Sequence, residues 1–155
     1  MLILPLSYDI LIKYNSKTEK SMQSEFNPSL LPGVTALAYL GDARHALFVR
    51  RMLLEKNVRK PKELNLLALD YVTAEAQAKA YERIAGLLTE CEADVFKRAY
   101  NSTHLNKPKH ASGKEYRIAT GFEAVIGMLE WMGNGERINE LLTVAYKEKE
   151  NDTEN

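Results

Sequence analysis

The chain has 155 residues, 45% of them hydrophobic and 27% charged, and its formal net charge is zero. This length is that of one domain with a hydrophobic core, and the neutral balance provides no whole-chain attraction to a polyanion. The single cysteine, Cys91, excludes a disulfide framework and a zinc ribbon, and indicates a reducing compartment.

Residues 1–30 show mixed polarity without a sustained period, and we interpret them as an N-terminal extension. The first apolar run lacks a basic start and is interrupted by Pro5 and Asp9, so it does not fit a signal peptide. No stretch approaches the roughly 20 apolar residues of a membrane span. We therefore expect a cytoplasmic protein without a membrane partner, with one domain over residues 31–148 and a polar tail over 149–155.

The chain follows a helical period from Val34 onward. Apolar and small residues recur on one face as far as Met52, which predicts a helix of five or six turns. Pro61 suits the first position of the next helix, and the Ala- and Glu-rich run after it is expected to form two helical pieces. Thr89 and Glu92 have the spacing of a capping box, which predicts another helix start.

A loop is expected where "THLNKPKHASGK", residues 103–114, breaks the period with Pro, Gly and polar residues. The helical period returns over residues 115–132, and a last amphipathic helix follows a glycine break. There is no β-type alternation and no repeat. The sequence therefore predicts an all-α fold with five to six main helices.

Two acidic residues, Asp42 and Glu123, border the apolar stripes of their helices. A carboxylate beside such a stripe is costly to desolvate. If the two helices pack together, the acids converge at a partly buried site, where Mg²⁺ and its preference for oxygen ligands would offset that cost. The alternative is that each acid is a solvated flank residue or the partner of an arginine such as Arg44 or Arg51.

Residues 97–117 hold six basic side chains against one acidic side chain, a local charge of +5. A basic loop leading into an acid-bearing helix suits a phosphate backbone held beside a metal. The alternative is an ordinary solvated loop, and a second basic group from Arg50 to Lys62 is interpreted as exposed helix ends. The candidate RNA-binding residues are Lys97, Arg98, Asn101, Lys107, Lys109, Lys114 and Arg117.

Three motifs carry a family resemblance: "ALAYLGDA", "FKRAYNS" and "YRIATGFEAVIG". The first, followed by "FVRRMLL", resembles the signature helix of the ribonuclease III family, and the third resembles that family's second acidic segment. Together they are closest to Mini-ribonuclease III, the small bacterial branch without a double-stranded-RNA-binding domain, over residues 33–146. The resemblance implies the helical bundle of the ribonuclease III endonuclease domain, a homodimer, and Asp42 and Glu123 as catalytic metal ligands.

The resemblance also implies a function. It points to an Mg²⁺-dependent endonuclease that cleaves double-stranded RNA, leaves 5′-phosphate and 3′-hydroxyl ends, and matures the large-subunit ribosomal RNA precursor. A ribosomal protein or pre-ribosome is a further expected partner. Ala38 and Thr120 stand where larger family members have acidic residues, and the Mini branch shares both reductions. Only two strong acids then remain to hold metal, which leaves open whether one ion binds or two.

Two other functions are compatible with the sequence. One is a catalytically inactive RNA-binding or ribosome-assembly protein of the same fold, although such a protein has no reason to keep two costly acids. The other is a helical interaction module in which Asp42 and Glu123 form salt bridges. His45 lies three residues from Asp42 and could hydrogen-bond to it, but a lone histidine on a packing face is interpreted as structural.

Overall fold

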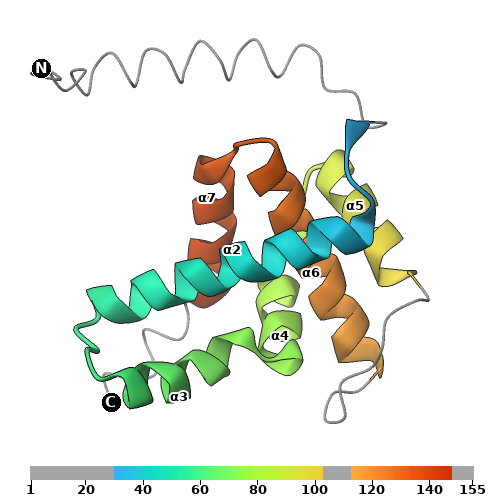
Figure 1. Ribbon diagram of the computed structural model, residues 1–155. Coiled ribbons are helices and arrows are strands. Elements are labelled where there is room, and N and C mark those ends of the chain that lie inside the picture. The colour runs from blue at the N-terminus through green and yellow to red at the C-terminus, as the bar shows by residue number, and fades with distance from the viewer. Residues whose placement is uncertain (1–29, 103–112, 148–155) are drawn as a thin grey trace, which may run out of the picture. The chain divides into compact units, whose positions relative to one another are not determined.

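The computed structural model describes residues 30–102 and 113–147, and its architecture is all-α, as predicted (Figure 1). Residues 1–29, 103–112 and 148–155, which include most of the predicted loop, lie outside this description. No helix in the described part is long and apolar enough to cross a membrane. The elements are α2 (Val34–Glu55), α3 (Pro61–Val72), α4 (Ala74–Ile84), a 3₁₀ turn (Ala85–Leu87), α5 (Glu90–Tyr100), α6 (Gly113–Trp131) and α7 (Gly135–Tyr146).

The helix boundaries follow local sequence signals. Pro61 is the first residue of α3, where its missing N–H costs no helical hydrogen bond. Thr73 separates the two predicted helical pieces, because its extended backbone ends α3 and its hydroxyl caps the start of α4. The predicted capping box is confirmed, since Thr89 and Glu92 satisfy each other's backbone N–H groups at the start of α5.

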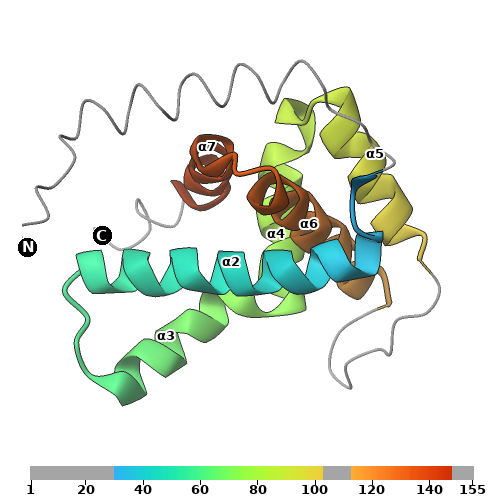
Figure 2. The same cartoon turned by 45° about the horizontal axis from the view of Figure 1, so that its top comes forward.

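Helix α6 is the central element of the domain. Every residue from Ile118 to Leu129 is buried except Glu123, which is partly buried. Helix α2 lies across α6, and α4, α5 and α7 also pack against it (Figures 1 and 2). A helix surrounded on all sides is apolar all round, so a single ionisable residue in its buried stretch is an exception that needs a reason.

The crossing of α2 over α6 is a backbone-to-backbone contact between two glycines. A Cβ atom added at Gly41 would lie 1.7 Å from the carbonyl oxygen of Glu123, and one added at Gly127 would lie 1.8 Å from the carbonyl oxygen of Leu37. No side chain fits at either position, so both glycines are required for the helices to approach this closely. Asp42 follows Gly41 directly, and the crossing therefore places it beside Glu123.

Candidate active site

The predicted acid pair comes together at the α2–α6 crossing. Asp42 is exposed on α2, whereas Glu123 is partly buried on α6. The pKa of Glu123 is raised to about 7, mainly by burial and also by the negative charge of Asp42, while a hydrogen bond from Gln77 acts in the opposite direction. The two carboxylates are thus close enough to interact, and a cation between them would relieve both the repulsion and the desolvation.

The alternative of structural salt bridges finds no support in the geometry. Arg44, a proposed partner of Asp42, instead directs its Nε to Glu130 Oε2 at 2.8 Å, and Arg51 is exposed. Within residues 30–102 and 113–147, the ion pairs include neither Asp42 nor Glu123. The pair is therefore not neutralised by the described part of the chain.

Among the described residues, Asp42 and Glu123 are not joined by a third His, Cys, Asp or Glu side chain. No group of three or more His, Cys, Asp or Glu side chains gathers there. Ala38 is buried without a polar group, and Thr120 donates its hydroxyl to the carbonyl oxygen of Tyr116 at 2.9 Å. A hard cation held by Asp42 and Glu123 would complete its shell with oxygen atoms from water or substrate, as Mg²⁺ sites commonly do.

A buried polar network that includes His45 lies beside the acids. His45 is fully buried, its Nε2 lies 2.6 Å from the hydroxyl oxygen of Tyr146, and its Nδ1 lies 3.4 Å from Nε2 of Gln77. Both ring nitrogens are thereby engaged, so the hydrogen bond to Asp42 that the sequence spacing allows does not form. The structural interpretation of His45 agrees with this position.

The protonation of His45 follows from its surroundings. Burial lowers its pKa to about 4, so the imidazole is neutral at physiological pH and has one donor and one acceptor. The amide nitrogen of Gln77 can only donate, which makes Nδ1 the acceptor. Nε2 therefore carries the hydrogen and donates a hydrogen bond to the hydroxyl oxygen of Tyr146. Sequence reasoning missed Gln77 and Tyr146, because no local pattern marks a glutamine or tyrosine that tertiary packing will bury.

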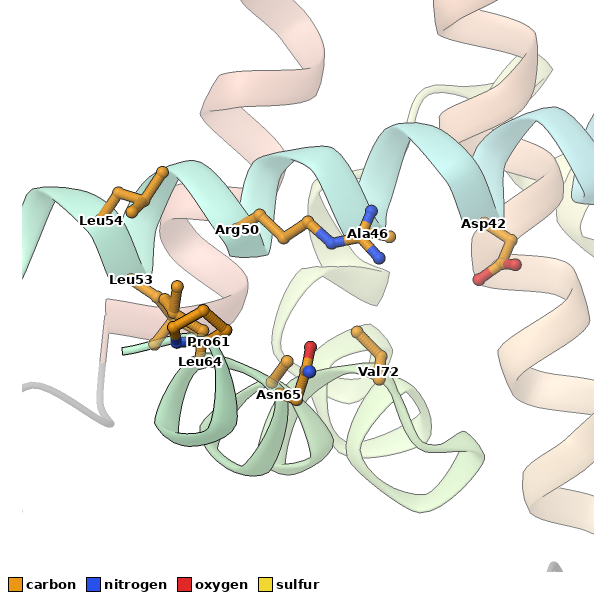
Figure 3. A pocket seen from close by; sticks show the side chains of 10 residues that line it. Asp42, Ala46, Arg50, Leu53, Leu54, Pro61, Leu64, Asn65 and Val72 are labelled. Atoms are coloured by element: carbon orange, nitrogen blue, oxygen red, sulfur yellow. The ribbon is translucent and has the colours of Figure 1, made fainter. Parts of the chain in front are cut away.

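A groove leads away from Asp42 between α2 and α3 (Figure 3). It has a volume of about 400 Å³ and a mostly apolar lining, with Asp42 at one end. Arg50 lies along α2 within it, with its guanidinium directed toward the Asp42 end (Figure 3). The interpretation of Arg50 as an ordinary exposed helix end is therefore incomplete, because its cationic group borders a groove that reaches the acid.

The described RNA-binding candidates gather where α5 ends and α6 begins. Lys97, Arg98 and Asn101 are exposed at the end of α5, and Lys114 and Arg117 are exposed at the start of α6. The Arg117 guanidinium carbon lies 5.9 Å from the ring centre of Tyr100 on α5, which links the two helix ends. Lys107 and Lys109 lie outside the described residues.

The structure does not place these basic residues on the face of α6 that carries Glu123. Lys114 precedes Glu123 by about 14 Å along the helix axis and lies on the opposite side of the helix, at 100° per residue. Arg117 is turned away from Glu123 by roughly 120° on the same basis. The basic residues of α6 therefore lie roughly two helical turns from Glu123 and on other faces of the helix.

Comparisons with known proteins show the family to which this chain is related. A family model for the ribonuclease III domain matches residues 35–132. A Mini-ribonuclease 3 of Symbiobacterium thermophilum is 44% identical, with 77% of this chain and 91% of the relative covered. A Mini-ribonuclease 3 of Streptococcus pneumoniae is 38% identical, with 79% and 96% covered. A crystal structure of a Fusobacterium nucleatum protein superimposes with a TM-score of 0.74 at 27% identity, and covers 84% of this chain and 100% of its own.

Proposed function

Because the chain belongs to the Mini-ribonuclease 3 branch of the ribonuclease III domain family, it is a ribonuclease, and we propose that it is an Mg²⁺-dependent endonuclease of double-stranded RNA. The observation that carries this proposal is the acid pair at the α2–α6 crossing. Asp42 and Glu123 approach each other without a neutralising cation in the described chain, and the close glycine contact between α2 and α6 brings them together.

Asp42 and Glu123 fit the donor set of a hard divalent cation. Both side chains offer carboxylate oxygens at the crossing, where Asp42 is exposed and Glu123 is partly buried. Bound Mg²⁺ supplies Lewis-acid chemistry that makes water more acidic and stabilises charge on a phosphate or leaving oxygen. Hydrolysis that breaks the bond between phosphorus and the 3′ oxygen leaves the 5′-phosphate and 3′-hydroxyl ends that we expect.

We assign RNA backbone binding to the basic end formed by α5 and α6. A-form RNA hides its base edges in a deep, narrow major groove, so recognition depends on the phosphate and sugar backbone and on shape. Exposed lysine and arginine side chains that lie away from the acids suit this role, since a duplex extends well beyond the bond that is cut. The residues assigned at this end are Lys97, Arg98, Asn101, Lys114 and Arg117. Lys107 and Lys109, which lie between the two helices in the sequence and outside the described residues, are assigned the same role.

A homodimer and a ribosomal RNA substrate complete the proposal. Several large apolar side chains of the described domain are exposed, including Tyr39 on α2, Leu66 and Leu69 on α3, and Trp131 at the end of α6. Such residues support an interface with a second copy, in which each copy cuts one strand. The proposed substrate is the large-subunit ribosomal RNA precursor, and the proposed location is the cytoplasm. A ribosomal protein or pre-ribosome is proposed as a further partner.

The proposal is tested by incubating the purified protein with a long double-stranded RNA in Mg²⁺ or in EDTA. We expect cleavage only in Mg²⁺, with 5′-phosphate ends, and a loss of about 100-fold or more in Asp42→Asn and in Glu123→Gln. Neither variant should lower the melting temperature of the metal-free protein, because each removes one of two repelling carboxylates. Glu130→Gln is the matched control, since it removes an acid of the same helix that pairs with Arg44.

Cleavage that persists in EDTA, or in both acid variants, would contradict the proposal. If the generic duplex is not cut, the assay is repeated with a stem of the ribosomal precursor. Absence of cleavage on both RNAs would favour the inactive RNA-binding protein of the same fold. A large drop in melting temperature in Asp42→Asn would instead favour a structural role for that acid.

A further inference from the structure

Gln77 is the polar residue of α4 that reaches the acid pair from inside the core. Its side chain is only 2% exposed, in a helix that otherwise buries alanines and Ile84. Its amide donates a hydrogen bond to the Glu123 carboxylate, and its Nε2 lies 3.4 Å from Nδ1 of His45. One buried amide thus connects the partly buried acid to the fixed histidine.

One orientation of the Gln77 amide serves both neighbours. A carboxylate only accepts hydrogen bonds, so the NH₂ group faces Glu123, and the same nitrogen, 3.4 Å from Nδ1 of His45, can only donate to that ring nitrogen. His45 is fixed in turn, because its Nε2 donates a hydrogen bond to the hydroxyl oxygen of Tyr146. No buried side-chain nitrogen or oxygen of the described residues lacks a partner. The amide therefore cannot turn without leaving a buried polar group unpaired.

We propose that Gln77 is a positioning residue for the metal site: its amide holds the Glu123 carboxylate in one rotamer, ready to bind the cation beside Asp42. This inference rests on the proposed function, in which Glu123 is a metal ligand. A free glutamate side chain samples several rotamers, and a ligand that is already fixed loses less entropy when metal binds. Hydrogen bonds to ligating carboxylates commonly influence metal affinity by about 10- to 100-fold.

The test compares Gln77→Met with Tyr146→Phe. Each variant leaves one nitrogen of His45 without its partner, so both should lower the melting temperature in EDTA by a similar amount. Only Gln77→Met also removes the donor to Glu123. We titrate each RNA-free protein with Mn²⁺, which shares the oxygen preference of Mg²⁺, and measure free Mn²⁺ by electron paramagnetic resonance.

We expect Gln77→Met to weaken Mn²⁺ binding by at least about tenfold and Tyr146→Phe by less than about threefold. The Mg²⁺ concentration for half-maximal RNA cleavage should shift by the same factors, and excess Mg²⁺ should restore cleavage by Gln77→Met. Equal shifts in the two variants, or no shift in Gln77→Met, would overturn the inference. If Gln77→Met does not fold, His45→Leu/Gln77→Met is titrated against His45→Leu, because removal of the imidazole leaves no unpaired ring nitrogen.

Glu123→Gln separates the two proposals. If the parent binds Mn²⁺ and Glu123→Gln does not, the metal site stands, and an unaffected Gln77→Met contradicts the positioning role alone. If the parent and Glu123→Gln bind Mn²⁺ alike, or neither binds, Glu123 is not a metal ligand and both proposals are wrong.

Discussion

The acid pair and the basic end of this domain differ in how they are held. Asp42 and Glu123 meet where two helix backbones touch through Gly41 and Gly127, above a fully buried hydrogen-bond network. The basic end consists of exposed side chains with long, solvent-exposed ion pairs. One example is Arg98, whose Nη1 lies 3.8 Å from Oδ2 of Asp94 on the same helix. The first region depends on close packing and the second on the number of charges.

This difference has a physical cause. A cation with two protein ligands needs both carboxylates in place at once, so a shift of about 1 Å is expected to be costly. Phosphate binding by exposed lysines and arginines is a sum of separate interactions, and removing one side chain leaves the others able to bind. Single substitutions should therefore have large effects at the crossing and small ones at the basic end.

The largest effect is expected for Gly127→Ala. Its new Cβ would lie 1.8 Å from the Leu37 carbonyl oxygen, so α2 and α6 must separate. We expect a loss of about 3 kcal/mol in the free energy of unfolding, and cleavage reduced by about 100-fold. Urea unfolding and the RNA cleavage assay measure the two effects. Gly86→Ala is the matched control, because a Cβ there meets nothing within 4 Å; equal effects in both variants would contradict a special role for the crossing.

Low pH should destabilise the buried hydrogen-bond network of His45, Gln77 and Tyr146. The pKa of His45 is lowered from 6.5 to about 4, so the unfolded chain binds a proton that the folded protein excludes between these values. The stability that this group contributes is present above pH 6.5 and is lost as the pH falls toward 4, by about 3 kcal/mol in total. Urea unfolding of the parent and of His45→Leu from pH 7 to pH 4 measures the difference. Parallel curves would show that His45 does not carry this pH dependence.

The smallest effect is expected for Lys114→Ala at the basic end. Binding of double-stranded RNA should weaken slightly at low salt, and the slope of log affinity against log salt should become shallower by close to one unit for each phosphate that is no longer neutralised. Replacing Lys107, Lys109 and Lys114 together should flatten the slope further. The slope is measured with an acid variant that cannot cut the RNA. Lys147→Ala, at the end of α7, serves as the exposed control, and identical slopes would remove Lys114 from the interface.

Local patterns predicted most of the fold. Pro61 and the Thr89–Glu92 capping box mark real helix starts, because these signals act within one helical turn. The apolar period identified α2 and α6 and the acids at their margins. The same patterns did not show that Arg50 borders a groove, or that His45 bonds to Tyr146 rather than to Asp42, because both depend on which helix becomes the neighbour.

The sequence by itself determined the helices, the two candidate metal ligands, the basic segment and the family, because helical period, capping and motif spacing are all properties of neighbouring residues. Only the tertiary structure decided that Gly41 and Gly127 bring the acids together, and that Gln77, 46 residues before Glu123 in the chain, donates to its carboxylate. Burial and hydrogen-bond partners are set by how α2, α4, α6 and α7 pack, and the residues that meet there are far apart in the chain.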